Sequence, residues 1–119
     1  MILGIGCDIV DIRRFQILIN KYNDKFTNKI FTTREINISK LTNSTSYFAK
    51  RFAVKEAYAK ASGYAIGKKI KFKAIEILND INGKPFFNKH PLSNDGVRAL
   101  VSISDEIPYA IAYVILERS

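Results

Sequence analysis

The feature that most constrains this sequence is an alanine-rich stretch over residues 45–62, whose pattern predicts one long helix. Ser44 or Ser46 is a suitable N-cap, and Gly63 is the kind of residue that ends a helix. The whole chain has 119 residues, which is close to the usual length of one domain. We therefore expect a single domain over residues 1–119 with one hydrophobic core.

The first residues predict a β-strand, because side chains of two kinds alternate over residues 2–10. One face carries apolar side chains and the cysteine: Leu3, Ile5, Cys7 and Ile9. The other face carries two glycines, a carboxylate and a valine: Gly4, Gly6, Asp8 and Val10. A glycine inside a strand often marks the close approach of another backbone or of a ligand. Cys7 is the only cysteine, and we expect it to be a small core residue.

Two shorter helices are predicted before the long one. Apolar residues recur with helical spacing over residues 11–24 and leave basic side chains outside, which indicates a basic amphipathic helix. Thr32 and Glu35 have the spacing of a capping box, which predicts a helix over residues 33–41.

The chain after the long helix predicts strands. Residues 70–78 indicate a strand with a bulge, and Asn82-Gly83 matches a hairpin turn. Two more strands are predicted over residues 97–103 and 109–116. Because strands and helices mix with short connections, we expect an α+β fold. Its largely antiparallel sheet would pack with one long helix and one or two shorter ones.

The charge of the chain favours an anionic partner. Lysine and arginine number 19 against 11 acids, for a net charge of +8, and residues 44–73 contain eight bases and one acid, Glu56. Nucleic acid, a phosphorylated ligand, an acidic protein or a membrane surface would fit, although a solvated lysine-rich surface explains the charge equally well. Residues 1–7, the longest apolar run, are too few for a membrane span and lack signal-peptide features. We expect a cytoplasmic protein without membrane contact.

Two carboxylates are candidate metal ligands. Projected around a helix, Glu56 falls beside Phe52 on the inward side, where a carboxylate needs a partner. A salt bridge to Lys60, one turn away, would supply that partner without any further function. Asp8 alone is explained as a helix cap or as the end of a strand. Together, Asp8 and Glu56 in a basic surrounding have the composition of a magnesium site that also receives phosphate oxygens.

Four segments carry a family resemblance. They are GIGCDIV at residues 4–10 with Arg14-Phe15 after it, FAKRFAVKEAYAKA at 48–61, NGKP at 82–85 and VSISD at 101–105. In this order they resemble holo-acyl carrier protein synthases, the short trimeric type of 4′-phosphopantetheinyl transferase. The resemblance spans nearly the whole chain, and the helical motif is rarely met outside phosphopantetheinyl transferases.

The resemblance implies transfer of the 4′-phosphopantetheine group from coenzyme A to a serine of apo acyl carrier protein, for fatty acid biosynthesis. It implies that Asp8 and Glu56 bind Mg²⁺ and are catalytic together with Lys60, which stabilises charge at the phosphates. It also implies contacts with coenzyme A from Arg51, Lys55, Lys60, Gly63, Lys84, Pro85 and Ser102. Family members of this length look like homotrimers with active sites between subunits, and we expect the same here.

Two departures from the family pattern bear on these expectations. Where the family usually has FGTG after the lysine helix, this chain has SGYA at residues 62–65, without the threonine hydroxyl and the second glycine. Asp105 stands where many members carry histidine, so no catalytic histidine is expected. We interpret His90, the only histidine, as structural or solvent-exposed.

The predicted basic helix is the expected docking surface for the carrier protein. Acyl carrier proteins are strongly acidic, and helical spacing leaves four basic side chains exposed: Arg13, Arg14, Lys21 and Lys25. The main alternative is a small basic nucleic-acid-binding domain, which six tyrosines and eight phenylalanines would support. A non-catalytic adaptor for an acidic protein would not explain an inward Glu56. We favour the transferase and expect no nucleic-acid partner, because Phe48 and Phe52 lie on the inward helix face.

Overall fold

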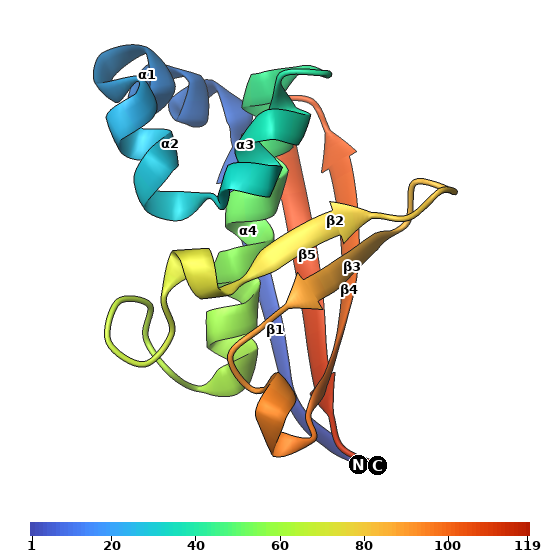
Figure 1. Ribbon diagram of the computed structural model, residues 1–119. Coiled ribbons are helices and arrows are strands. Elements are labelled where there is room, and N and C mark those ends of the chain that lie inside the picture. The colour runs from blue at the N-terminus through green and yellow to red at the C-terminus, as the bar shows by residue number, and fades with distance from the viewer.

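A computed structural model describes the whole chain, residues 1–119, as antiparallel strands around one long helix (Figure 1). The four helices are α1 (Ile12–Tyr22), α2 (Asp24–Ile30), α3 (Thr33–Ser39) and α4 (Ser44–Ser62). The five strands are β1 (Ile2–Asp11), β2 (Glu76–Asn79), β3 (Pro85–Lys89), β4 (Arg98–Glu106) and β5 (Tyr109–Glu117). Two short 3₁₀ segments, η1 (Phe72–Ala74) and η2 (Ser93–Asp95), flank the β2–β3 hairpin. The predicted α+β class with antiparallel strands is confirmed.

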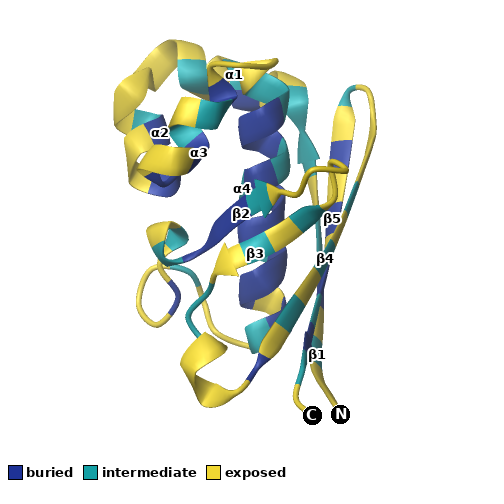
Figure 2. Ribbon diagram, turned by 45° about the vertical axis from the view of Figure 1, so that its right-hand side comes forward, coloured by how far each residue is buried: buried dark blue, intermediate teal, exposed yellow.

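The strands form two antiparallel units. β5 lies at the centre of a three-stranded sheet in the order β1-β5-β4, and β2 pairs with β3 as a hairpin. The predicted Asn82-Gly83 turn is confirmed, because Gly83 joins these two strands with a φ of 83°. Figures 1 and 2 show α1, α2 and α3 gathered at one end of α4, with the hairpin beside its middle. The end of α4 near α1 is therefore where several elements converge.

α4 supplies much of the interior, as its dark colour in Figure 2 shows. One cluster of buried side chains joins α4 to the sheet and to β2, and it includes Ala57, Ile77 and Val114. A second, mostly aromatic cluster joins the other end of α4 to α1 and α2, and it includes Phe15 and Phe48. The predicted inward position of Phe48 is confirmed.

The two glycines of β1 let the strand lie directly on α4. A Cβ atom added to Gly4 would lie 1.9 Å from the carbonyl oxygen of Ala61, and one added to Gly6 would lie 1.9 Å from that of Ala57. No side chain fits there, so β1 contacts the backbone of the helix, as a strand glycine predicts. Asp8 follows on the same face of β1 and is brought close to α4 in this way.

The opposite face of the sheet is open, which corrects the expectation for Cys7. Cys7 is only partly buried, because the glycine face of β1 packs on α4 and the face with Cys7 points away. Large apolar side chains on that outward face are exposed in the single chain: Leu3, Ile5, Ile9, Tyr109, Ile111 and Tyr113. The three-stranded sheet thus presents an apolar outer face.

The long helix and its cap agree closely with the prediction. α4 ends at Gly63, whose φ of 80° is left-handed as expected. Its N-cap is Asn43 rather than Ser44 or Ser46, because the Asn43 side chain accepts a hydrogen bond from the Ser46 amide. The predicted capping box is confirmed, with Thr32 capping α3.

Two other segments differ from the prediction. The helix expected over residues 11–24 stops at Asn23, which has a φ of 52°, so Lys25 lies on α2 rather than on the first helix. The strand expected over residues 70–78 is the 3₁₀ segment η1 followed by the short β2. None of the four helices combines the length and hydropathy needed to cross a bilayer.

Candidate active site

Asp8 and Glu56 line one cavity of about 340 Å³ between β1, α1, α2 and α4. β1 supplies Asp8, α4 supplies Glu56 and α1 supplies Arg14. The other lining residues are mostly apolar: Ile9, Val10, Asp11, Phe15, Leu18, Phe26 and Phe52. The fold therefore brings the two candidate metal ligands together, although they are far apart in the sequence.

Lys60 pairs with Asp8, not with Glu56. Its ammonium lies 3.1 Å from Asp8 Oδ1 and also donates a hydrogen bond of 3.0 Å to the backbone oxygen of Cys7. The simple helix-surface pair between Glu56 and Lys60 is absent. The N-cap of α1 is Asp11, which accepts from the Arg13 amide, so Asp8 is not the cap of that helix.

Glu56 is a half-buried carboxylate without a hydrogen-bond or ion-pair partner. Burial raises the pKa of its carboxyl group, the negative charge of Asp8 raises it further, and the positive charge of Lys60 opposes both. Two carboxylates that repel each other across one cavity are a suitable pair of ligands for a hard divalent cation. No group of three or more acidic, histidine or cysteine side chains offers a fuller metal site elsewhere in the chain.

Aromatic side chains form one wall of this cavity. Phe15 lies at the centre, with ring centroids 5.3 Å from those of Phe26 and Phe52. Phe52 in turn stacks on Phe72, at 5.7 Å and an interplanar angle of 28°. The sequence analysis placed Phe52 beside Glu56 but missed Phe26, because α2 was not predicted as a separate helix.

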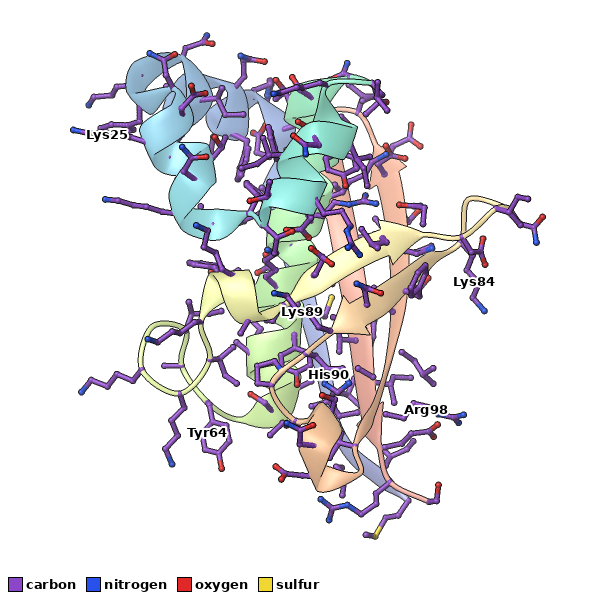
Figure 3. The ribbon with its side chains drawn as sticks, in the orientation of Figure 1. Lys25, Tyr64, Lys84, Lys89, His90 and Arg98 are labelled. Atoms are coloured by element: carbon purple, nitrogen blue, oxygen red, sulfur yellow. The ribbon has the colours of Figure 1, made fainter.

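The residues predicted to bind a carrier protein lie on α1 and α2. Arg14, Lys21 and Lys25 are exposed, and Figure 3 shows Lys25 pointing away from the body of the protein. Arg13 is also exposed, but its guanidinium is held by Asp11 through a hydrogen bond of 2.8 Å. Arg14 additionally lines the cavity with the two carboxylates, which the sequence analysis did not anticipate.

The sequence of the chain matches one family over residues 4–114, described as the 4′-phosphopantetheinyl transferase superfamily. The chain belongs to this superfamily. A holo-[acyl-carrier-protein] synthase from Wolbachia sp. subsp. Drosophila simulans (strain wRi) is 46% identical over 121 residues and covers 98% of both chains. The synthase from Ehrlichia chaffeensis is 47% identical over 120 residues, or 98% of this chain and 97% of the relative.

Solved structures of the same superfamily agree with this assignment. The holo-[acyl-carrier-protein] synthase from Neisseria meningitidis has a TM-score of 0.91 and 38% identity, covering 99% of this chain and 100% of the other. The synthase from Bacillus anthracis, in complex with CoA (3′,5′-ADP), has a TM-score of 0.89 and 38% identity, covering 100% and 99%. The fold and the family resemblance inferred from the sequence are confirmed.

Two basic residues of the superfamily's helical motif lie inside the protein. Lys55 is fully buried and forms an ion pair of 2.8 Å with Glu35, so it has no exposed surface with which to contact coenzyme A. Arg51 is 4% exposed, lies over the Tyr47 ring and donates to the side chain of Asn79. Arg51 has no carboxylate partner, its Nε has no acceptor, and burial lowers the pKa of its guanidinium. The structure thus gives the Lys55 ammonium acceptors inside its own chain and leaves Arg51 as a buried cation without an acidic partner.

The other predicted contacts of coenzyme A do not line the cavity of their own chain. Gly63 follows the last turn of α4 and is exposed. Lys84 and Pro85 belong to the β2–β3 hairpin, where Figure 3 shows Lys84 far from α1 and α2. Ser102 lies opposite Tyr113 on the outer face of the sheet.

His90 and Asp105 have structural contacts. His90 Nδ1 lies 2.9 Å from the Tyr58 hydroxyl, and burial lowers the pKa of its imidazole. Asp105 forms an ion pair of 3.0 Å with Lys50. The interpretation of His90 as a structural residue is confirmed.

Proposed function

We propose that this chain transfers the 4′-phosphopantetheine group of coenzyme A to a serine of apo acyl carrier protein. The products are holo acyl carrier protein and adenosine 3′,5′-bisphosphate, and the reaction serves fatty acid biosynthesis in the cytoplasm. The observation that carries this proposal is the cavity that contains Asp8, Glu56 and Arg14, with Lys60 bonded to Asp8. Full-length relatives named holo-[acyl-carrier-protein] synthase support it. All 119 residues act here as one transferase domain.

In this proposal Asp8 and Glu56 bind Mg²⁺, and the enzyme depends on it. Both side chains line the same cavity, and Glu56 has no other partner. Magnesium uses one or two protein carboxylates and keeps several waters, so these two ligands are sufficient. A Mg²⁺ ion held by Asp8 and Glu56 would supply positive charge against the pyrophosphate of coenzyme A.

Lys60 stabilises the charge that develops in the reaction. The serine hydroxyl gives up its proton to water as its oxygen bonds to the phosphorus of the phosphopantetheine group. The bond from that phosphorus to the bisphosphate breaks, and the electron pair leaves with the bisphosphate. The Lys60 ammonium is positioned by its hydrogen bonds to Asp8 Oδ1 and to the Cys7 carbonyl oxygen. From this position it can stabilise the negative charge that develops on the leaving group.

We further propose that coenzyme A binds between the subunits of a homotrimer. Support comes from the apolar outer face of the sheet, since an exposed patch of this kind marks an interaction surface. Gly63, Lys84, Pro85 and Ser102 lie apart from the cavity of their own chain, and a site shared between subunits would let them contact the ligand from a neighbouring copy. Arg51, a buried cation without an acid, suits a phosphate group.

The carrier protein docks on α1 and α2 in this proposal. Arg14 and Lys21 are exposed on α1, and Lys25 and Lys29 are exposed on α2. These basic side chains lie on α1 and α2, two of the helices that line the cavity, and their charge complements an acidic partner. A nucleic-acid-binding function has no comparable support, because much of the aromatic content packs in the interior rather than on an open stacking surface.

The test of the proposed function is a mass measurement. Apo acyl carrier protein is incubated with this protein, coenzyme A and Mg²⁺, and the carrier is weighed by mass spectrometry. The proposal predicts a mass increase of one phosphopantetheine group. An unmodified carrier, together with salt-sensitive RNA binding, would reject the transferase in favour of the nucleic-acid alternative.

A further inference from the structure

The buried ammonium of Lys55 holds three segments of the chain at once. It donates hydrogen bonds to Glu35 Oε1 at 2.8 Å, to the backbone oxygen of Ile30 at 2.8 Å and to that of Phe72 at 3.1 Å. A lysine ammonium has three donors, so every donor has an acceptor inside the protein. Lys55 therefore links α4 by hydrogen bonds to the end of α2, to α3 and to η1.

Glu35 extends the same set of contacts to a further strand. Its Oε1 also accepts a hydrogen bond of 3.0 Å from the Thr32 amide, and its Oε2 accepts one of 3.0 Å from the Ile77 amide of β2. Both side chains of the ion pair are completely buried. Burial of a charge pair costs desolvation energy that the pair itself rarely repays, so stability alone is weak grounds for its presence.

Two of the fastened segments support the aromatic wall of the cavity. Ile30 is the last residue of α2, the helix that contributes Phe26 to the wall. Phe72 stacks on Phe52, which also lines the cavity. The ammonium of Lys55 is thus linked to both parts of the wall. Its hydrogen bond to Ile30 holds the helix that carries Phe26, and its hydrogen bond to Phe72 holds the residue on which Phe52 stacks.

The two carboxylates are held by different contacts. Asp8 stands on β1, which lies against α4 through Gly4 and Gly6, and its carboxylate is bonded to Lys60. None of these contacts involves α2, α3 or η1. Glu56 stands on α4, as Phe52 does. Loss of the Lys55 contacts should therefore displace α2 with Phe26, and η1 with the Phe72 ring on which Phe52 stacks, relative to the carboxylates.

We infer that the Lys55–Glu35 pair is a positioning device that places Phe26 and Phe52 for the carrier protein rather than for coenzyme A. This inference rests on the proposed function, in which the carrier docks on α1 and α2 beside that wall. Lys55 and Glu35 touch neither substrate, and they act through the backbone of Ile30 and through Phe72.

The test uses the double variant Lys55→Met, Glu35→Gln. It removes both buried charges together and keeps the net charge of the chain. The glutamine side chain still has an amide oxygen that can accept a hydrogen bond from the Thr32 or the Ile77 amide. The Michaelis constant for the carrier should rise about tenfold, because small displacements of a binding wall are costly. The Michaelis constant for coenzyme A and the magnesium dependence should stay within about twofold of the native enzyme.

A second readout follows the wall without any substrate. In protein labelled with fluorophenylalanine, the ¹⁹F resonances of Phe26 and Phe52 should shift in the double variant. Tyr113, which lies on the outer face of the sheet away from the buried pair, serves as the control in a second sample labelled with fluorotyrosine, and its resonance should stay in place.

A second variant, Phe72→Ala, keeps the buried pair and removes only the support of Phe52. It should raise the Michaelis constant for the carrier selectively as well, and it remains informative if the double variant fails to fold. Lys40→Met, which changes an exposed lysine outside both surfaces, should leave both Michaelis constants unchanged.

The outcomes separate this inference from the proposed function. Unchanged Phe26 and Phe52 resonances in the folded double variant, or equal changes in both Michaelis constants, would overturn the inference. An unchanged carrier constant in Phe72→Ala would overturn it too. Failure of the native protein to modify a carrier, with the expected resonance shifts still present, would count against the proposed function and against the carrier as the group that the wall serves.

Discussion

Glu56 and Asp8 illustrate how the site depends on individual contacts. The pKa of the Glu56 carboxyl is raised first by burial and then by the charge of Asp8, while Lys60, bonded to Asp8, opposes this shift. Without a cation between them, the charge of Asp8 disfavours the charged form of Glu56. Glu56 therefore has the electrostatics of a binding-site ligand rather than those of a stabilising ion pair.

Glu56→Gln should raise the melting temperature slightly in the absence of metal. The charged form of Glu56 is disfavoured in the folded chain. The carboxylate therefore lowers the free energy of unfolding fully at a pH above its raised pKa, and this destabilisation disappears as the pH falls below the ordinary pKa of 4.5. At pH 7 with EDTA we expect a gain of about 1–2 °C, kept small by the solvent around a half-exposed group. The gain should vanish near pH 4. Calorimetric scans of both proteins, with the exposed Glu106→Gln as the control, check this; a lower melting temperature at pH 7 would contradict it.

At the level of the elements, the site depends on the close packing of β1 on α4. Gly4 and Gly6 contact the helix backbone, and this contact sets the position of Asp8 relative to Glu56. The same packing gives Lys60 a partner on β1 instead of one on its own helix. The geometry of the site therefore depends on the distance between a strand and a helix.

Gly6→Ala should destabilise the fold by about 3 kcal/mol, because its Cβ would overlap the carbonyl of Ala57 and the backbone has no room to yield. Cys7→Ala, on the neighbouring residue with its side chain on the other face, should cost less than about 1 kcal/mol. Urea unfolding of both variants measures the difference. Equal stabilities for the two would show that the close approach has no energetic consequence.

The double variant Arg14→Glu, Lys21→Glu should weaken carrier binding by reversing the charge of α1. At low salt we expect the association rate with the carrier to fall at least about tenfold. Stopped-flow association at two salt concentrations measures this. Lys40→Glu with Lys89→Glu makes the same change in net charge on other elements and should have a much smaller effect. If the two double variants slow association equally, α1 is not the docking surface.

Local patterns predicted the elements better than their partners. The capping box of Thr32 and the Gly63 stop depend on neighbours in the chain, so the sequence contains the whole signal. The partner of Lys60 could not be predicted, because its contact with Asp8 spans 52 residues and depends on how β1 packs on α4. The acceptors of Lys55 could not be predicted either, since they lie on three other segments. Helical spacing places a residue on a face, but it does not say what covers that face.

At the scale of the whole molecule, the apolar outer face of the sheet is the main feature that a single chain leaves unexplained. Its exposed side chains come from both β1 and β5, and Ile111 of the central strand lies opposite Ile9 and Ser104. The alternation in β1 predicted two faces correctly. It could not say which face was inside, because both contain residues that a core accepts.

Ile111→Lys should prevent assembly without unfolding the chain. The new ammonium would lie in the middle of the proposed interface, where an unpaired charge is costly, but in the single chain it would face solvent. Light scattering should give about three times the 13.5 kDa chain mass for the native protein and the single-chain mass for the variant. A native protein that is active as a monomer would refute the trimer.

The central claim is that Asp8 and Glu56 hold one ion for the transfer reaction, and a double-mutant cycle tests it most directly. Asp8→Asn and Glu56→Gln preserve side-chain size while each removes an anionic ligand, so each should reduce turnover by about 100-fold or more and raise the magnesium requirement. The double variant should lose far less than the product of the two single effects, because both residues serve the same ion. Carrier modification is measured by mass spectrometry across magnesium concentrations, with unfolding followed in parallel. Near-native turnover and magnesium dependence in a folded Glu56→Gln protein would contradict the account.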